Sequence, residues 1–514
     1  MRIGVDFDNT IVCYDALFHR VALEQNLIPA DLPVNKSEVR NHLRRLGREP
    51  LWTEMQGYVY GARMAEAAPF PGVIEFFQEC RRAGIPVSII SHKTLQPFLG
   101  ERHDLHQAAR QWLEQQGFFD PAKIGLPRDE VFFELTKEAK LQRIAQCGCD
   151  CFIDDLPELL AEPAFPKIER ILFDPADLYE AETQFFRARS WADISERIAI
   201  AHFAAAHGFK YPAPIVPLSG GANNRVYLVN EGGHKVVVKH YFRHAADTRD
   251  RFASERAFYD YLWERGIRRT PQPLAWDADK RLGLFSFVGE RKLQPGEVDE
   301  YAVESAIKFV VELNQDRPAG IPLASEACFT LAEHLDLIDK RVARLQKIEP
   351  ATDIDRQALA FVRESLQPSW RRIREAIRAH PEGAEHRVLS PSDFGFHNAL
   401  IGGEGQICFF DFEYAGWDDP AKLICDFFCQ PQVPVPLKFW GQVTQTLAAA
   451  FHAGDSLDAR ARLLLPAYQI KWRCIMLNEF VRQDRARRDF AQGAATAEQR
   501  KIMQLAKARE AFPD

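Results

Sequence analysis

Two different orders of strands and helices follow one another along this chain, and they constrain its fold more than any other feature. Before about residue 175, β-branched apolar runs alternate with segments whose apolar residues recur every three or four positions. The expected strands are 2–5, 85–90, 151–153 and 168–173, and the expected helices are 73–83, 105–116 and 138–147. Such alternation is typical of an α/β parallel sheet covered by helices on both faces. Residues from about 14 to 70 are mainly helical in character and are expected to form an insertion.

After about residue 206 the pattern changes to short strands followed by helices. Residues 225–230 and 235–240 flank a Glu-Gly-Gly turn, which is a hairpin signal. A helix is expected at 251–265, with further strands near 273–276 and 282–288. Beyond Asp299 the chain is expected to be almost wholly helical, except near 388–412. These features predict a small antiparallel lobe followed by a larger helical lobe, an α+β bilobal domain.

The length and charge of the chain limit its organisation and its partners. A chain of 514 residues is too long for one ordinary core. We expect one domain at 1–175, a helical connector at 176–205 and a second domain at 206–514. The net charge of −7 argues against a nucleic-acid partner. No run of about 18 apolar residues suggests a membrane helix, and the N-terminus does not resemble a signal peptide, so a cytoplasmic protein is expected.

Two carboxylates lie immediately after the first expected strand. Asp6 and Asp8 belong to the run D-F-D-N-T. Ligands of open parallel sheets bind at the carboxyl ends of strands, and residues two apart on an extended chain point the same way. One carboxylate could therefore attack a phosphorus atom while the other protonates the leaving oxygen.

Three further elements suited to phosphate chemistry follow in the first domain. Ser91 ends a strand, and its hydroxyl could bind a phosphate oxygen. Lys140 could neutralise charge on phosphorus, although Lys137 is a neighbouring candidate. Asp154 and Asp155 end another strand and are hard oxygen ligands suited to magnesium. His92 and Lys93, next to Ser91, are expected to lie in a surface loop.

The ordered set D-x-D-x-T, Ser, Lys and D-D resembles the haloacid dehalogenase-like superfamily over residues 1–175. The resemblance implies a Rossmann-like phosphatase domain whose insertion at about 14–70 is a helical cap. It also implies that Asp6 is the nucleophile, that Asp8 is the general acid and base, and that Ser91 and Lys140 bind phosphate. Magnesium would be held by Asp6, Asp154 and the backbone carbonyl of Asp8, with help from Asp155. The implied substrate is a small phosphomonoester.

In the second domain, a glycine-rich run precedes a strand that ends in lysine. Gly220, Gly221, Asn223 and Asn224 lie in L-S-G-G-A-N-N-R-V, where paired glycines allow backbone amides to approach phosphates. Lys239 ends the strand V-V-V-K, and Glu255 follows sixteen residues later on the next helix. Such a pair can hold the lysine against nucleotide phosphates, whereas the alternative is a surface lysine beside an unrelated glutamate.

The run from 389 to 400, L-S-P-S-D-F-G-F-H-N-A-L, is the most informative part of the second domain. Asp393 and Asn398 lie five positions apart, and Asp411 follows in F-F-D-F-E. This is the catalytic-loop and metal-aspartate pattern of eukaryotic-like kinases. Asp393 would deprotonate an acceptor hydroxyl, while Asn398 and Asp411 would bind magnesium bridging the phosphates of ATP.

Residues 206–490 resemble the aminoglycoside phosphotransferase and choline kinase group. The matching features are G-G-x-N-N, D-F-E in place of D-F-G, and W-D-D-P at 417–420 with Asp426 beyond. The resemblance implies a protein-kinase-like fold that phosphorylates small molecules with ATP and Mg²⁺. Phe287 would lie in the hinge that receives adenine. The group usually has histidine two residues before the catalytic aspartate, whereas Pro391 stands there in this chain.

The preferred interpretation is a bifunctional enzyme. The second domain would transfer the γ-phosphoryl group of ATP to the hydroxyl of a small metabolite, and the first would hydrolyse a phosphomonoester. One alternative is a single-activity kinase with a regulatory or scaffolding first domain. Another is a non-catalytic nucleotide-binding module, which the Ser390-Pro391-Ser392 loop motivates. The sequence identifies neither substrate and gives no oligomeric state.

Overall fold

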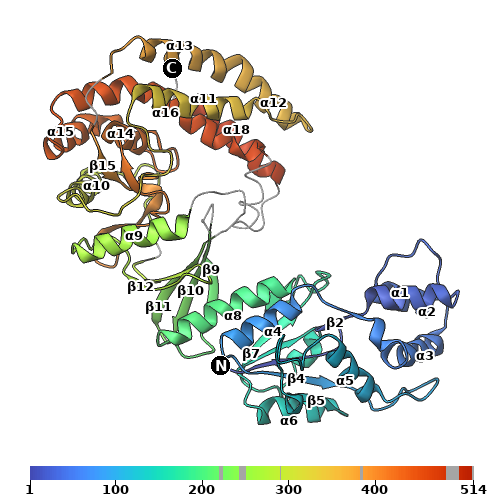
Figure 1. The fold of residues 1–514 in the computed structure, drawn as a ribbon. Helices are drawn as coiled ribbons and strands as arrows, with labels where there is room; N and C mark the ends of the chain where they lie inside the picture. Colours follow the sequence, from blue (N-terminus) through green and yellow to red (C-terminus); the bar gives the residue numbers. More distant parts are fainter. Residues whose placement is uncertain (219–223, 242–249, 290, 383–385, 482–496, 512–514) are drawn as a thin grey trace. The chain divides into compact units, whose positions relative to one another are not determined.

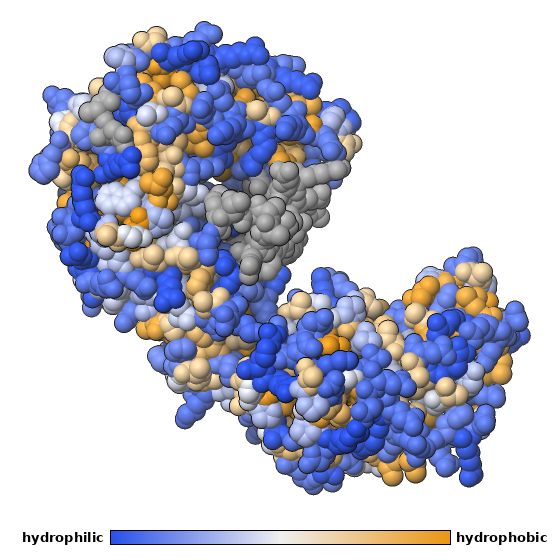
Figure 2. Space-filling view, in the orientation of Figure 1, coloured by the Kyte–Doolittle hydropathy of each residue, from blue (hydrophilic) through white to orange (hydrophobic). Residues whose placement is uncertain are grey.

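The computed structural model describes residues 1–218, 224–241, 250–289, 291–382, 386–481 and 497–511 (Figure 1). The chain divides into two compact units, Met1–Ala213 and Pro214–Asp514. Each unit is described by itself. Hydrophilic residues cover most of the visible surface (Figure 2). Among the described residues, no helix combines the length and the apolar character that crossing a membrane requires.

A six-stranded parallel sheet forms the centre of the first unit. Its strand order is β5-β4-β1-β6-β7-β8, with every neighbouring pair parallel. The strands are β1 (Ile3–Val5), β4 (Val87–His92), β5 (Val131–Glu134), β6 (Cys151–Asp154), β7 (Glu169–Phe173) and β8 (Phe186–Ala188). The helices of this unit outside the insertion are α4 (Val73–Arg82), α5 (Leu105–Gln115), α6 (Lys137–Gln146), α7 (Pro157–Leu160) and α8 (Trp191–Ala206). The parallel sheet was expected, but β5 and β8 were not.

The expected insertion is present and helical. It contains α1 (Asp15–Glu24), α2 (Lys36–Arg45), α3 (Glu49–Tyr60) and the short η1 (Met64–Glu66). The chain enters it through β2 (Val12–Cys13) and leaves through β3 (Ala68–Pro69), and these two strands pair with each other. The paired strands therefore anchor the insertion directly after the Asp6–Asp8 segment.

The expectation of a connector at 176–205 was wrong. Residues of β8 extend the sheet beside β7, and α8 packs into the core of the first unit. Trp191 is 1% exposed, and its Nε1 donates to the backbone oxygen of Thr10 at 3.1 Å. Trp191, Ile194 and Ile198 form an apolar stripe at helical spacing, which outweighs the charged residues between them.

The second unit begins with a five-stranded antiparallel sheet of order β12-β13-β11-β10-β9. The strands are β9 (Ile215–Leu218), β10 (Arg225–Glu231), β11 (His234–His240), β12 (Pro273–Asp277) and β13 (Leu282–Ser286). The predicted hairpin is confirmed, because Glu231 pairs with His234 across the turn. Helix α9 (Arg251–Glu264) lies between β11 and β12 in the chain.

The rest of the second unit is mainly helical. Its helices among the described residues are α10 (Glu300–Leu313), α11 (Leu331–Leu345), α12 (Asp353–Phe361), the π-helical η3 (Val362–Leu366), α13 (Gln367–Arg378), η4 (Phe396–Asn398), α14 (Pro420–Cys429), η5 (Leu437–Phe439), α15 (Trp440–Ala450), α16 (Ser456–Met476), η6 (Leu477–Phe480) and α18 (Ala497–Glu510). Two small sheets interrupt them, one of β14 (Arg291–Lys292), β16 (Ala399–Ile401) and β17 (Ile407–Phe409), the other of β15 (Val388–Ser390) and β18 (Gly416–Asp418). These strands hold both ends of the segment that contains Asp393 and Asp411.

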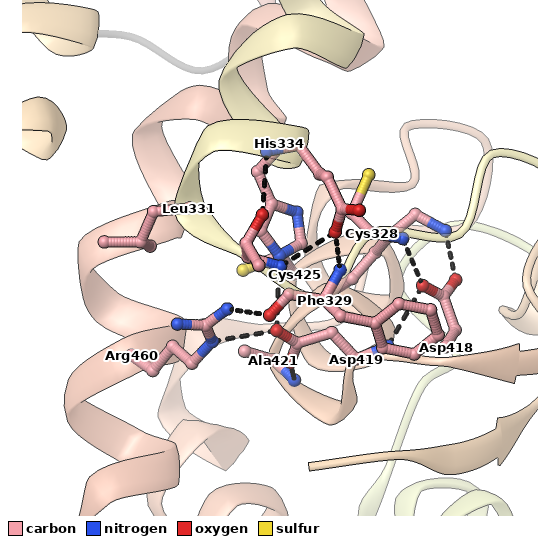
Figure 3. Close-up of polar contacts among 12 residues, drawn as sticks. Cys328, Phe329, Leu331, His334, Asp418, Asp419, Ala421, Cys425 and Arg460 are labelled. Carbon is pink, nitrogen blue, oxygen red and sulfur yellow. Dashed lines mark hydrogen bonds and ion pairs between the residues drawn. The ribbon is translucent and has the colours of Figure 1, made fainter. Parts of the chain in front are cut away.

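The buried carboxylate of Asp419 connects helices α11, α14 and α16 (Figure 3). Asp419 caps α14 by accepting from the backbone N–H of Ala421 at 2.6 Å. Its other oxygen contacts His334 Nε2 of α11 at 3.2 Å and accepts from Arg460 Nε of α16 at 2.8 Å. The W-D-D-P run therefore ties the helical scaffold together.

Candidate functional site

Three carboxylates meet at the carboxyl ends of β1 and β6. Asp6 follows β1, Asp154 ends β6, and the backbone N–H of Asp6 donates to the Ile153 oxygen at 2.9 Å. One carboxylate oxygen each from Asp6, Asp154 and Asp155 lies within 4.8 Å of the others. Hard oxygen ligands at this spacing fit a divalent cation such as magnesium. The carboxylate of Asp8 is not part of this group.

Lys140, on α6, joins two of these carboxylates. It is 1% exposed, and its Nζ lies 2.6 Å from both Asp6 Oδ1 and Asp154 Oδ2. Lys137 instead pairs with Glu162 at 2.5 Å, so of these two lysines it is Lys140 that contacts the carboxylates. Burial raises the pKa of Asp6 to about 7, against the opposing charge of Lys140 and with a further rise from Asp154.

Lys93 belongs to the site, contrary to the expectation of a surface loop. Its Nζ lies 2.9 and 3.0 Å from the two carboxylate oxygens of Asp8, and Tyr14 donates its hydroxyl to Asp8 at 2.5 Å. Burial raises the pKa of Asp8, but Lys93 and the Tyr14 hydrogen bond outweigh it and hold the pKa below its usual value. His92 is exposed, but it ends strand β4 and does not lie in a loop. Lys93 is buried, and its backbone N–H donates to the Glu134 oxygen at 2.9 Å, which continues the alignment of β4 with β5.

Ser91 lies at the same edge of the sheet as Asp6. Ile89 pairs with Val5, and Ser91 follows two residues later on β4. Its side chain is 1% exposed. The position agrees with the expected phosphate-binding role, which stays a prediction.

A lysine and two acidic residues form a tight cluster in the second unit. Lys239 Nζ lies 2.6 Å from Glu255 Oε2 and 2.5 Å from Asp411 Oδ1. Glu255 is 1% exposed on α9, and its second oxygen accepts from the backbone N–H of Phe412 at 3.0 Å. Burial raises the pKa of Glu255 to about 7, with Lys239 opposing the rise and Asp411 adding to it. The alternative of a surface lysine beside an unrelated glutamate is thus excluded.

Two side chains organise the loop around Asp393. Asn398 Nδ2 donates to the backbone oxygen of Asp393 at 3.0 Å, so the side-chain oxygen of Asn398 points away from that carbonyl. His397 Nε2 lies 3.2 Å from Asp393 Oδ1. Removal of water from around the Asp393 carboxylate raises its pKa. The charge and hydrogen bond of His397, with the charge of Lys471, outweigh this effect and hold the pKa below its usual value. His397 was not singled out from the sequence, because the related group carries its histidine before the aspartate.

Each of the two site loops of the second unit contains a residue in a left-handed backbone conformation. Ser392, directly before Asp393, has φ +67°, and Asp411 has φ +69°. Such left-handed conformations in residues other than glycine cost about 1–3 kcal/mol each and persist where the surroundings enforce them. Both residues lie in the segments that contain Asp393 and Asp411, although Arg281, Glu326 and His452 of the same unit share this conformation.

The structure places the other predicted nucleotide-binding residues as follows. Gly220, Gly221 and Asn223 lie outside the described residues. Asn224 is buried, and its Nδ2 donates to Glu413 Oε2 at 2.6 Å, two residues beyond Asp411. Phe287 is half-buried directly after β13, with Lys235 Nζ 4.8 Å from its ring centre.

Trp472, on α16, lies against Asp426. Its Nε1 donates to Asp426 Oδ1 at 2.9 Å, and Lys471 Nζ pairs with the same carboxylate at 2.7 and 2.8 Å. Asn478 accepts from Arg344, and Glu479 pairs with Arg500 at 2.9 Å. These contacts join α16 and η6 to neighbouring helices, so a structural role accounts for all three residues.

Comparison with known proteins identifies part of the chain. Residues 214–464 match the phosphotransferase enzyme family, so the second unit carries a phosphotransferase domain. No curated protein matches the chain.

Solved structures similar to the chain include three small-molecule kinases. A choline kinase from Cryptosporidium parvum Iowa II has 13% identity and a TM-score of 0.40, with 62% of this chain and 96% of that chain covered. An ethanolamine kinase from Plasmodium vivax has 12% identity and a TM-score of 0.41, with coverages of 65% and 92%. A choline/ethanolamine kinase family protein from Mesorhizobium loti has 18% identity and a TM-score of 0.39, with coverages of 62% and 99%. Because these scores lie below 0.5, the assignment rests on the family match.

Proposed function

We propose that the chain is a bifunctional enzyme: its second unit phosphorylates the hydroxyl of a small metabolite with ATP, and its first unit hydrolyses a phosphomonoester. The observation that carries the kinase half is the Lys239–Glu255–Asp411 cluster, which lies in a domain of the phosphotransferase enzyme family. Buried groups that are held this closely and have shifted pKa values favour a functional site.

In the kinase half, Asp393 orients the acceptor hydroxyl and takes its proton as the oxygen attacks the γ-phosphorus atom. His397 holds the Asp393 carboxylate in place through Nε2. Lys239, positioned by Glu255, contacts the nucleotide phosphates. Asn398 and Asp411 would hold magnesium, which supplies positive charge to the phosphate oxygens when bound.

In the phosphatase half, an oxygen of Asp6 attacks phosphorus, the bond to the leaving oxygen breaks, and Asp8 supplies that oxygen with a proton. Water then attacks the aspartyl-phosphate and gives a proton to Asp8, which releases phosphate and regenerates Asp6. Lys93 and Tyr14 favour the carboxylate form of Asp8, which suits this second step. Asp6, Asp154 and Asp155 would hold magnesium, which supplies positive charge at the phosphoryl oxygens when bound.

The supporting observation for this half is the convergence of three carboxylates and Lys140 at the carboxyl edge of a parallel sheet. Ligands bind at this edge in open α/β sheets. The helical insertion, anchored by β2 and β3 directly after Asp8, supplies side chains beside the same edge.

The test is a metabolite screen of wild type, Asp6→Asn and Asp393→Ala with ATP and magnesium. ADP and free phosphate are measured separately. We expect acceptor-dependent ADP to be lost only in Asp393→Ala and phosphomonoester hydrolysis to be lost only in Asp6→Asn. Hydrolysis equal in wild type and Asp6→Asn would leave a single-activity kinase. ADP production equal in wild type and Asp393→Ala would leave a nucleotide-binding module.

A further inference from the structure

A lysine of the helical insertion reaches the candidate phosphatase site. Lys36 is the first residue of α2, and its Nζ donates to Asn9 Oδ1 and to the Tyr60 hydroxyl, both at 2.8 Å. Asn9 directly follows Asp8 and has φ +57°, a left-handed conformation. The ammonium group of Lys36 therefore contacts the residue that follows Asp8, the proposed proton donor to the leaving group.

Aromatic rings surround this ammonium group. Its distances to the ring centres of Phe18, Tyr60 and Tyr14 are 5.4, 5.5 and 5.6 Å. Ring faces attract a cation but do not neutralise it. They also limit access of water to its sides, so a negatively charged ligand would interact strongly with it.

Lys36 differs from the other lysines of the site in its partners. Lys140 pairs with Asp6 and Asp154, and Lys93 pairs with Asp8. In the part of the chain that the structure describes, Lys36 forms no ion pair with a carboxylate, and its two hydrogen-bond partners are neutral oxygens. An ammonium group has three donors, so one donor is available to a ligand.

The charge of Lys36 is maintained at neutral pH. Burial lowers its pKa, but Tyr60 and the more distant Asp155 and Asp8 outweigh this and raise the pKa above its ordinary value. Lys36 is half-buried and carries its charge without a direct anionic contact among the described residues, so an anionic ligand group could supply that contact.

We propose that Lys36 binds a second anionic group, a phosphate or a carboxylate, on the leaving-group side of the phosphomonoester. The inference rests on the proposed phosphatase function. The reacting phosphoryl group belongs at Asp6, and the leaving oxygen belongs at Asp8. A ligand group next to Asn9 and Lys36 is therefore part of the leaving molecule. The substrate class is then a bisphosphate or a phosphorylated acid.

The test compares matched substrates that differ by one anionic group. Phosphoglycerate is compared with glycerol phosphate for the carboxylate, and a hexose bisphosphate with its monophosphate for the second phosphate. Lys36→Met removes the charge at similar length, and Lys36→Arg retains it. Lys137→Met is the matched control, because this lysine pairs with Glu162 instead.

In wild type we expect kcat/KM for the member with the additional anionic group, in at least one pair, to exceed that for the member without it by about tenfold, which is typical of one charge-assisted hydrogen bond. Lys36→Met should lose this preference while its kcat/KM for the member without the additional group stays within about twofold. Lys36→Arg should keep most of the preference, and Lys137→Met should keep all of it. The pair that shows the preference identifies the anion as phosphate or carboxylate.

Two results would overturn the inference, and they are distinguishable. Turnover without preference in either pair, or a preference that survives in Lys36→Met, would refute the role of Lys36 and leave the phosphatase function intact. Turnover that is absent, or equal in wild type and Asp6→Asn, would remove the phosphatase function and this inference with it. An unchanged melting temperature of Lys36→Met separates either result from misfolding.

Discussion

Replacing His397 tests how the catalytic loop of the second unit is organised without the usual preceding histidine. His397→Ala removes the Nε2 contact to Asp393 Oδ1 but leaves the hydrogen bond from Asn398 to the Asp393 backbone. The Lys239–Glu255–Asp411 cluster also remains. We therefore expect kcat to fall while KM for ATP changes little.

The size of the effect follows from the contact. A hydrogen bond to a charged group contributes about 1.5–3 kcal/mol. The contact in the structure is long, at 3.2 Å, and the Asp393 side chain is 36% exposed, so water replaces part of it. The lower limit therefore applies, and about 1.4 kcal/mol corresponds to a tenfold fall in kcat.

The pH dependence supplies a second readout. Among the groups that lower the pKa of Asp393, His397 has the largest effect. Its loss should raise that pKa, so the acidic limb of kcat, which requires the carboxylate, should move to higher pH. His397→Gln, which can still donate a hydrogen bond, should recover part of kcat.

The assay is steady-state ADP release with varied ATP and saturating acceptor. His380→Ala is the control, because His380 is exposed just beyond the end of α13. The reasoning is refuted if His397→Ala keeps kcat within twofold of wild type. It is also refuted if the variant raises KM for ATP alone or loses no more activity than His380→Ala.

Three further predictions concern other parts of the chain. Glu255→Gln should reduce kcat/KM for ATP by about tenfold or more in the same ADP assay, because it removes one charged contact to Lys239 and keeps an acceptor for the Phe412 N–H. Trp191→Ala should destabilise the first unit by about 3–5 kcal/mol in urea unfolding, because a fully buried ring is lost; an effect below about 1 kcal/mol would contradict the packing of α8. Burial raises the pKa of Asp419, but His334 and Arg460 outweigh burial and lower the pKa. The Asp419 carboxylate therefore stabilises the folded unit above the unfolded pKa near 4, and this contribution is lost as the pH falls further. Asp419→Asn should be less stable by about 3 kcal/mol at pH 7 and should weaken that acid dependence in thermal unfolding, whereas an unchanged profile would exclude this carboxylate as its source.

Much of each candidate site could be predicted because its residues occupy positions that local pattern defines. Asp6 and Asp154 end strands of one parallel sheet, and parallel strands bring their carboxyl ends to the same edge. Lys239 lies near the end of β11, which the hairpin pattern predicted, and Asp393 follows the short strand β15. In contrast, β8 and α8 were assigned to a connector, because a short edge strand and a helix with charged residues carry a weak local signal.

The sequence by itself determined that strands and helices alternate in the first unit and that strands precede helices in the second. It also placed acidic residues at strand ends, because each of these features depends on local spacing. Only the tertiary structure decided which side chains surround those carboxylates. Lys36 reaches Asn9 from an inserted helix, and Lys93 reaches Asp8 from just beyond the end of β4. His397 contacts Asp393, four residues before it. Such contacts depend on how the insertion packs and how each loop bends. These arrangements are set by the balance of burial and charge over the whole unit, which no local pattern contains.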